Sequence, residues 1–354
     1  MIPVSIVNVT SYTGLELLRL LAGHPEFVVT SVTGRSAAGQ RLDDVFPQLA
    51  AGRNHNPTGH NIGSLVISEK AEKTELAFVC LPHAAAATTV LELLAQGSKV
   101  VDLSADFRLH DARVYEEWYQ HTHPAPALLE TSVYGLCERY REQIAASQLV
   151  ANPGCHSSTA ILALLPAVAA GLIGPDIVVT TLTGISGAGR GLKLSSLYCE
   201  QDEDASAYSL SGHRHLPEIV QELEAGARDG GHPMQLRLTF VPHLVPMSRG
   251  LLATCYADKK EPSLTIEEVR AVYTAYYANE PAIRVVETAP HTRWTSGTNL
   301  CYIYPTLDPR TGRLVVVSCL DNLGKGAAGQ AIQNANLMCD LPETAGLPTS
   351  SLMP

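Results

Sequence analysis

The strongest constraint on the fold lies at the start of the chain, where strand, turn, helix and strand patterns follow closely. The β-branched run from Ile2 to Val9 predicts a buried strand, Leu15 to Leu21 an amphipathic helix, and Phe27 to Thr33 a second strand. Such a βαβ unit belongs to a parallel sheet. Its first turn can hold a dinucleotide pyrophosphate at the N-terminus of the helix.

The glycine pattern of this turn is incomplete. At the usual spacing only Gly14 is present, and Asn8 and Ser11 occupy the other two positions. Asparagine tolerates a positive φ, and the serine hydroxyl is a possible phosphate donor, so the turn can keep its shape. A plain βαβ turn without a ligand remains the alternative.

The residues after the second strand bear on the choice of nucleotide. Arg35 and Ser36 stand where an acidic residue would bind a ribose 2′-hydroxyl, and the next acidic residue is Asp43. An arginine here suits a 2′-phosphate, which favours NADP over NAD. The alternative is a surface arginine in a loop.

The rest of the first half continues the α/β pattern after a polar excursion over residues 37–72. Further strands and a helix are predicted at Leu76 to Leu81, Ala84 to Ala95 and Lys99 to Leu103. Asp106 and Arg108 follow the last of these strands, at the sheet edge where open α/β sheets bind ligands. They could form a structural ion pair, or Arg108 could clamp a phosphate or carboxylate.

The stretch Asn152-Pro153-Gly154-Cys155 ends a short strand and begins a long apolar helix. Cys155 therefore lies at the positive end of a helix dipole, which favours the nucleophilic thiolate. Ser157, Ser158 and Thr159 are available to cap amides of the first turn. The pattern suits covalent acyl transfer. A buried, unreactive cysteine is the alternative.

The second half has a different pattern, with strands that alternate weakly and fewer helices. Strands are predicted at 176–182, 235–241, 251–257, 300–304 and 314–319, and helices at about 217–224, 265–278 and 330–338. The sequence thus predicts a Rossmann-type α/β dinucleotide-binding domain plus an α+β domain with a mostly antiparallel sheet.

Charge and cysteine usage exclude several classes of protein. The net charge of −10 gives no support to nucleic-acid or anionic-membrane binding. Eight scattered cysteines without a CxxC pair, and no signal peptide, predict a soluble cytoplasmic protein. His121/His123 and His213/His215 form HxH pairs, but no cysteine or carboxylate accompanies them at ligand spacing, so no metal is predicted.

These features together point to one kind of chemistry. A thiol plus a nicotinamide fits the oxidation of an aldehyde to an acyl group, or the reverse. The thiol would hold the acyl group while the cofactor moves hydride, and a histidine would serve as acid and base.

The sequence resembles the N-acetyl-γ-glutamyl-phosphate reductase family of arginine biosynthesis, within the semialdehyde dehydrogenase superfamily. The matching motifs occur in order along nearly the whole chain, at residues 103–108, 152–155, 186–190, 212–219, 242–250 and 321–330. The resemblance implies that NADPH reduces an acyl phosphate, N-acetylglutamyl phosphate, to the semialdehyde with release of phosphate.

The resemblance also implies roles for individual residues. Cys155 would be the nucleophile, and His213 or His215 the acid and base. The phosphate and the substrate carboxylate would be bound by Arg108, Arg190 and Arg249. NADP(H) would be bound by Ser11, Tyr12, Thr13, Gly14, Arg35, Ser36, Pro82, His83, Ser186, Gly187 and Asn322.

The family fold implies that residues 1–154 with 322–354 form the NADP-binding domain, and that 155–321 form the catalytic and oligomerisation domain. A homodimer or homotetramer is expected. After the cysteine the family commonly has an aromatic residue and a proline. Here His156 and Ser157 stand instead, and we interpret His156 as a helix cap.

Three alternatives remain at this stage. One is a sister reductase of lysine biosynthesis that acts on a carrier-bound aminoadipyl phosphate. Another is a cysteine acyl-phosphate hydrolase that has lost its cofactor, which the altered glycine turn motivates. The third is a nucleotide-binding protein without enzymatic activity.

Overall fold

The computed structural model describes residues 1–50 and 61–352, so part of the predicted excursion at 37–72 lies outside the described residues. The chain divides into two compact units, which are described separately. The first comprises Met1–Pro153 and Ala327–Leu347, and the second Gly154–Gly326 and Pro348–Pro354.

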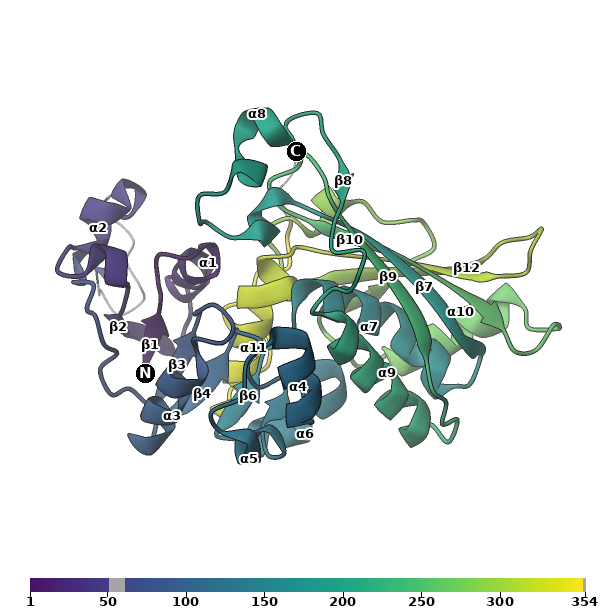
Figure 1. The fold of residues 1–354 in the computed structure, drawn as a ribbon, viewed down its shortest axis with the longest axis horizontal. Helices are drawn as coiled ribbons and strands as arrows, with labels where there is room; N and C mark the ends of the chain where they lie inside the picture. The colour runs from purple at the N-terminus through teal and green to yellow at the C-terminus, as the bar shows by residue number, and fades with distance from the viewer. Residues whose placement is uncertain (51–60, 353–354) are drawn as a thin grey trace. The chain divides into compact units, whose positions relative to one another are not determined.

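The first unit is built on a six-stranded sheet in which every pairing is parallel (Figure 1). The strand order is β2-β1-β3-β4-β6-β5. Its strands are β1 (Ile2–Val7), β2 (Phe27–Val32), β3 (Leu76–Val79), β4 (Lys99–Asp102), β5 (Val133–Tyr134) and β6 (Leu149–Ala151). The Rossmann-type prediction is confirmed.

The helices of this unit are α1 (Tyr12–Leu21), α2 (Leu42–Val45), α3 (Ala87–Ala95), α4 (Ala112–Tyr119), α5 (Pro126–Leu129), α6 (Cys137–Ala146) and α11 (Gly329–Met338). The sequence did not predict α4, α5 or α6. On α11 the small side chains of Ala331 and Ala335 are fully buried, and Asn334 donates to the carbonyl of Gly135 at 2.9 Å. Small residues let α11 pack closely against the rest of the unit.

The second unit contains a seven-stranded mixed sheet in the order β11-β12-β13-β10-β7-β9-β8. Four of its pairings are antiparallel and two are parallel, as expected for the α+β domain. The strands are β7 (Ile173–Thr183), β8 (Ser206–Ala207), β9 (Arg237–Leu244), β10 (Leu251–Lys259), β11 (Ile283–Val285), β12 (Cys301–Leu307) and β13 (Leu314–Leu320).

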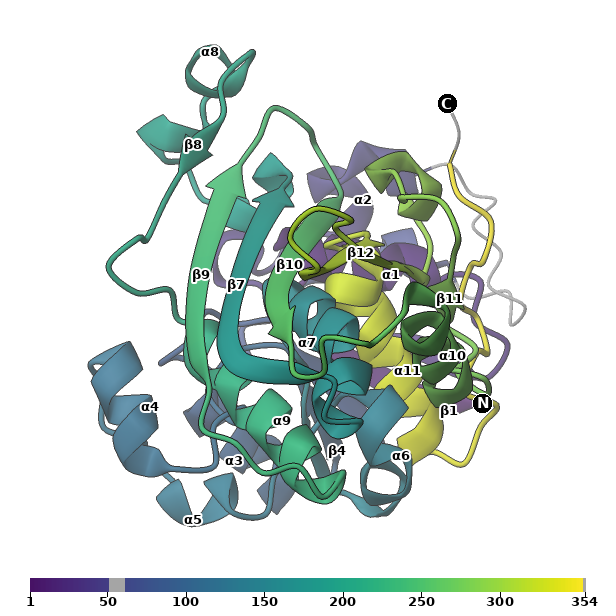
Figure 2. The same cartoon turned by 90° about the vertical axis from the view of Figure 1, so that its right-hand side faces the viewer.

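Helices cover one face of this sheet, as Figures 1 and 2 show for α7 (Cys155–Ala169), α9 (Leu216–Asp229) and α10 (Ile266–Tyr276). Along β10 buried residues alternate with partly exposed ones, which fits a sheet with one covered face. The short helix α8 (Tyr198–Gln201) lies in a largely exposed segment. α7 is the central helix, because Tyr273 and Tyr277 of the α10 segment donate to its carbonyls at Ala163 and Leu162.

One buried carboxyl of the first unit makes stability depend on pH. Asp102 is fully buried, and this burial raises the pKa of its carboxyl to about 7 although Ser104 donates to it. Above about pH 4 the unfolded chain loses a proton that the folded protein keeps. The free energy of unfolding should therefore fall between about pH 4 and 7, by up to ~1.4 kcal/mol per pH unit.

Urea unfolding across this pH range checks the prediction. We expect Asp102→Asn to remove most of the slope. A slope that is equal in the wild type and the variant would show that Asp102 is already ionised in the folded protein.

Within residues 1–50 and 61–352, no helix combines the length and the apolar character that crossing a membrane requires.

Candidate active site

The turn between β1 and α1 keeps its shape without the missing glycines. Asn8 has φ of 64°, and its side-chain amide donates to the carbonyl of Cys80 at 2.8 Å. Ser11 is the N-cap of α1: its hydroxyl accepts from the amide of Gly14 at 3.0 Å and donates to the carbonyl of Asn8. A Cβ on Gly14 would lie 2.7 Å from the Cα of Val9, so only glycine fits there.

A cavity of about 1120 Å³ lies beside this turn, entirely within the first unit. Its lining includes Asn8, Arg35, Ser36 and Pro82. Lys70 also lines it, and the sequence analysis missed this residue because it lies in a stretch without periodicity. The cavity is large enough for a dinucleotide. Its lining carries two basic side chains, Arg35 and Lys70, and two acidic ones, Glu69 and Glu92, so an anionic group would be bound beside the basic pair.

Other predicted cofactor residues of the first unit do not line this cavity. Tyr12 is exposed at the start of α1, next to Thr13 in the same turn. His83 is exposed, with its ring 5.7 Å from that of Tyr119. The roles of these three residues stay predictions.

Arg108 is buried in the first unit. Its guanidinium donates to the carbonyls of Asn152 at 2.8 Å and Leu103 at 3.1 Å. The carboxylate of Asp106 accepts from the backbone amides of Ala84, Ala86 and Ala87 and from the hydroxyl of Tyr115. These contacts give both side chains a structural role, and substrate binding by Arg108 stays a prediction.

Cys155 is the first residue of α7, and its side chain is partly exposed. Gly154 precedes it as the N-cap, in an extended conformation. The backbone of Gly326 lies close to the side chain of Cys155, because a Cβ on that glycine would be 2.8 Å from the Cβ of Cys155. The nucleophile candidate therefore has the position that the sequence predicted, at the positive end of a long helix.

The first turn of α7 is capped differently from the prediction. No side chain caps its N-terminus. The hydroxyl of Thr159 donates back to the carbonyl of Cys155, and that of Ser157 donates to the carboxylate of Glu218, 61 residues away. The predicted capping by serines and by His156 is wrong, because Ser157 and His156 make tertiary contacts instead and the buried Oγ of Ser158 has no hydrogen-bond partner among the described residues.

His215 lies at the N-cap of α9 and packs against the turn that carries Cys155. Its Nε2 is 3.8 Å from Oε1 of Glu218, which is almost fully buried. This separation is longer than a hydrogen bond, so the carboxylate acts on the imidazole through its charge. The pair has the arrangement of an acid/base histidine held by a second group.

Gly154 is the residue that allows this packing. A Cβ there would clash with Nε2 of His215 and lie 2.7 Å from Oε1 of Glu218. We expect Gly154→Ala to displace the imidazole and lower kcat about 100-fold, since small misplacements in active sites have effects of this size. Steady-state kinetics check this, with Gly23→Ala as the control, because nothing lies within 4 Å of a Cβ at Gly23. Equal rates for both variants would contradict it.

His156 is buried beneath the site and is held at both ring nitrogens. Its Nδ1 lies 2.9 Å from Oγ1 of Thr181, and its Nε2 lies 3.0 Å from the hydroxyl of Tyr208. His213 packs beside it with ring centroids 5.5 Å apart, and Nδ1 of His213 accepts from the amide of His215 at 3.2 Å. The three histidines thus form one cluster.

Burial keeps two of these rings neutral. It lowers the pKa of His156 to about 3, with a smaller contribution from His213. Burial also lowers the pKa of His213 to about 4, with a smaller contribution from Arg214. At neutral pH both imidazoles therefore carry no charge.

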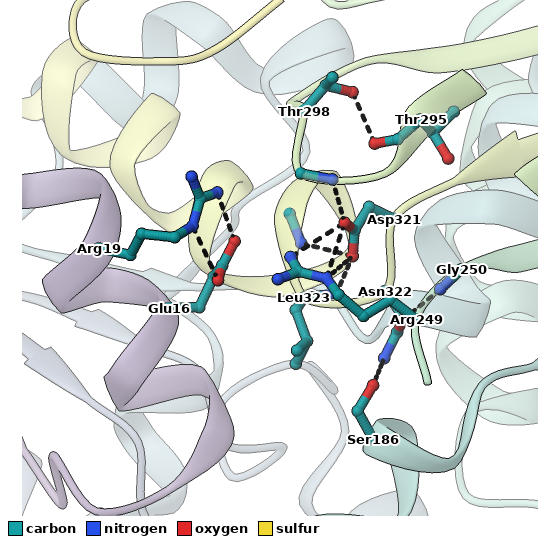
Figure 3. Close-up of polar contacts among 12 residues, drawn as sticks. Glu16, Arg19, Ser186, Arg249, Gly250, Thr295, Thr298, Asp321, Asn322 and Leu323 are labelled. Atoms are coloured by element: carbon teal, nitrogen blue, oxygen red, sulfur yellow. Dashed lines mark hydrogen bonds and ion pairs between the residues drawn. The ribbon is translucent and has the colours of Figure 1, made fainter. Parts of the chain in front are cut away.

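A second group of predicted residues surrounds Asp321, which is fully buried (Figure 3). Arg249 contacts its carboxylate through Nε at 3.0 Å and through a terminal nitrogen at 2.9 Å. The amides of Gly297 and Leu323 donate to the same carboxylate. Arg249 is thereby fixed, and its role toward the substrate stays a prediction.

Asn322 connects two loops of the second unit. Its Oδ1 accepts from the amide of Gly250 at 2.8 Å, and its Nδ2 donates to the hydroxyl of Ser186 at 2.9 Å (Figure 3). Gly187 follows in the same loop, and Arg190 is exposed just beyond it. The structure brings Ser186 and Asn322 together, and the cofactor roles of these residues stay predictions.

Comparison with known families agrees with this geometry. Residues 3–147 match the model of the semialdehyde dehydrogenase NAD binding domain, and residues 155–322 match the semialdehyde dehydrogenase dimerisation domain. The chain belongs to the semialdehyde dehydrogenase family. The match to a dimerisation domain supports oligomerisation through the second unit.

Within this family the most similar relatives carry one name. An N-acetyl-gamma-glutamyl-phosphate reductase of Dehalococcoides mccartyi is 50% identical over 350 residues, covering 99% of this chain and 98% of that protein. One of Desulfotalea psychrophila is 46% identical over 358 residues and covers both chains fully.

Solved structures of semialdehyde dehydrogenases share the fold. Aspartate semialdehyde dehydrogenase II from Vibrio cholerae has a TM-score of 0.68 at 16% identity, covering 96% of this chain and 98% of that one. The Candida albicans enzyme, solved with NADP, has a TM-score of 0.69 at 16% identity with the same coverage.

In this semialdehyde dehydrogenase the sequence analysis missed two residues beside the candidate site. Glu218 follows the HxH motif at helical spacing, which could have indicated a partner for His215. Tyr208 lies in a polar segment 52 residues from His156, and no local pattern points to their contact.

Proposed function

We propose that this chain catalyses the NADPH-dependent reduction of N-acetyl-L-glutamyl 5-phosphate to the 5-semialdehyde and phosphate, a step of arginine biosynthesis. The observation that carries the proposal is the position of Cys155 at the start of α7, beside the turn against which His215 and Glu218 pack. The substrate is inferred from the name shared by the relatives.

The first step is covalent. The thiolate of Cys155 attacks the acyl carbon, the bond from that carbon to the phosphate oxygen breaks, and a thioester forms as phosphate leaves. The N-terminus of α7 stabilises the thiolate through its dipole. Amides of the first helical turn, which have no partner within the helix, can stabilise the developing oxyanion.

The second step releases the aldehyde. When bound, NADPH supplies the hydride that reduces the thioester carbon. We assign proton transfer to His215: its imidazolium protonates the oxyanion of the hemithioacetal, and the neutral ring takes the proton back as the carbon–sulfur bond breaks. Glu218 stabilises the imidazolium and keeps the ring directed toward the Cys155 turn.

Arg249 and Arg190 are proposed to bind the anionic groups of the substrate, with Arg108 in a supporting role. Arg249 is held by Asp321 with its side chain 24% exposed, so part of the guanidinium can meet a ligand. Arg190 is exposed on a glycine-rich loop that can adapt to an anion. Arg108 would support the loop after β4 through its bonds to two carbonyls.

The first unit is proposed to hold NADP(H). Its cavity, the helix N-terminus at α1, and the absence of room for a Cβ at Gly14 fit a dinucleotide. In this unit the proposal covers the predicted residues Ser11, Tyr12, Thr13, Gly14, Arg35, Ser36, Pro82 and His83. Ser186, Gly187 and Asn322 belong to the second unit, and a cofactor role for them is proposed from the family resemblance alone. Arg35 with Lys70 would bind the 2′-phosphate.

Arg35 provides a direct prediction of cofactor preference. We expect Arg35→Ala to raise the KM for NADPH by about 10-fold, the value of a charged hydrogen bond, and to leave the KM for NADH unchanged. Arg41→Ala is the control, because Arg41 is another exposed arginine, paired with Asp43, that is not part of the cavity lining. An equal change in the KM for NADPH and for NADH would show that Arg35 does not bind the 2′-phosphate.

The reaction run backwards tests the whole proposal. N-acetylglutamate semialdehyde, phosphate and NADP⁺ should give NADPH at a steady rate that depends on phosphate. No NADPH from a folded protein would contradict the proposal. Hydrolysis of the acyl phosphate without cofactor would then favour the hydrolase, and a requirement for a carrier protein the lysine-pathway enzyme. Inactivity in all three assays would favour a non-enzymatic nucleotide-binding protein.

The proposal extends to the oligomeric state of the protein and to its cellular compartment. The dimerisation-domain match supports a homodimer or homotetramer formed through residues 155–322. All eight cysteines lie within the described residues and none is in a disulfide, which supports a reducing, cytoplasmic location.

A further inference from the structure

The second unit contains a cluster of three histidines, of which the proposed reductase reaction uses only His215. His156 comes from the first turn of α7, and His213 and His215 precede α9. One ligand nitrogen from each ring lies within 4.8 Å of the other two. The sequence analysis dismissed a metal because the His213/His215 pair had no third ligand nearby in the chain. The fold supplies that ligand from 57 positions earlier in the chain.

The hydrogen bonds of these rings suit metal binding. Metal-bound histidines commonly donate their second ring N–H to a protein oxygen. His156 has such a partner, because Oγ1 of Thr181 lies 2.9 Å from its Nδ1 and leaves Nε2 as the coordinating atom. The lone pair of His213 is on Nδ1, so His213 coordinates through this atom and gives up the bond from the His215 amide.

We propose that His156, His213 and His215 bind one zinc ion, with water in the fourth position, and that this zinc reversibly inhibits the enzyme. Three histidines and a water form a familiar tetrahedral zinc site. Bond lengths of 2.0–2.1 Å require the nitrogens to be about 3.4 Å apart, so nitrogens up to 4.8 Å apart must approach by up to about 1.4 Å. Ring centroids 4.8 to 5.5 Å apart allow this by side-chain rotation.

Inhibition follows from the position of His215, and this part of the inference rests on the proposed function. A zinc ion on the imidazole of His215 uses the lone pair that would otherwise accept a proton. The ion would also stand beside the turn that carries Cys155. Zinc binding itself does not depend on the reaction, so it can be measured separately.

The test measures the zinc affinity of the complete chain by competition with a chromogenic chelator. Zinc is the only ligand added. We expect one tight zinc per subunit in the wild type. His156→Phe should weaken it at least about 100-fold, since even outer-shell losses weaken metal sites 10- to 100-fold. The matched control is His121→Gln, because His121 is an exposed histidine of the other unit and its loss should leave the affinity unchanged.

A cysteine thiolate could bind the zinc in place of the histidines, and two further measurements distinguish these two kinds of ligand. Cys155→Ser should retain zinc within about 3-fold. Cobalt(II) bound to the wild type should show tetrahedral absorption without thiolate charge transfer. Zinc that survives His156→Phe, zinc lost in Cys155→Ser, or a cobalt–thiolate spectrum would each overturn the site.

Tyr208 gives a prediction of opposite sign. Its hydroxyl lies 3.0 Å from Nε2 of His156 and must give up that hydrogen bond when a metal binds. Tyr208→Phe should therefore bind zinc about 2- to 10-fold more tightly, the value of one hydrogen bond. Weaker zinc binding in this variant would contradict coordination through Nε2.

Inhibition is then measured as the reductase rate with zinc divided by the rate of the same protein without zinc. Micromolar zinc should inhibit the wild type and His121→Gln but not His156→Phe. Zinc binding without inhibition would overturn the regulatory part alone. If no reductase activity exists, the chelator titration still decides whether the site exists.

Discussion

Cys155→Ala lowers kcat for the reductase reaction by at least about 10⁴-fold, because no other group in the account forms the covalent intermediate. Cys155 occupies the first position of α7, where the helix dipole favours its thiolate. The variant should still bind NADPH, because the proposed cofactor cavity is lined by residues of the first unit alone. Steady-state rates and fluorescence titration of NADPH provide the two readouts.

The control for this prediction is Cys199→Ala. Cys199 is an exposed cysteine of the second unit, and its loss should change kcat by less than 2-fold, as expected for a surface position. Alkylation of the wild type with iodoacetamide should inactivate it in step with modification of Cys155. An active Cys155→Ala enzyme would exclude the thioester mechanism.

His215→Gln is expected to lower kcat by about 10²- to 10⁴-fold, the usual contribution of a general acid and base. The structural reason is its contact with the Gly154 turn and the carboxylate of Glu218, 3.8 Å from Nε2. The variant should also lose the limb of the pH–rate profile that reports this histidine, which a structural role alone would not produce.

The comparison with His213 decides between the two histidines that the sequence left open. His213 is buried and neutral, and its Nδ1 accepts from the amide of His215, so it supports the loop. We expect His213→Gln to lower kcat no more than about 10-fold and to keep the pH profile. The reverse order of effects would assign the acid/base role to His213.

The parts of this protein that the sequence predicts well are those fixed by local patterns. The buried run of β1 and the helix that follows it determine the βαβ unit, and Asn8 adopts the positive φ that its residue type allows. The Pro-Gly turn and the long apolar run after it locate Cys155 at a helix start. Each of these features depends on residues within one or two turns of chain.

The features that the sequence missed depend on distant partners. His156 was interpreted as a cap, but Thr181 and Tyr208, which hold it, are 25 and 52 residues away. Ser157 likewise reaches Glu218, 61 residues away. A pattern of residue types cannot specify such contacts, because tertiary packing decides which side chain meets a buried ring.

The short helices between β4 and β6 were missed for another reason. α5 has four residues, and α6 contains a non-helical Tyr140. A four-residue segment such as α5 is too short for a helical periodicity to emerge, and the non-helical Tyr140 interrupts the periodicity of α6.

The most direct measurement of the central claim, covalent catalysis by Cys155, is a rapid-mixing experiment in the oxidative direction without phosphate. Semialdehyde and NADP⁺ should give a burst that approaches one NADPH per subunit and then stops, because the thioester cannot leave without its acceptor. Addition of phosphate should restart turnover, and Cys155→Ala should show no burst. NADPH formation that needs phosphate from the first turnover, or a burst that persists in Cys155→Ala, would contradict the account.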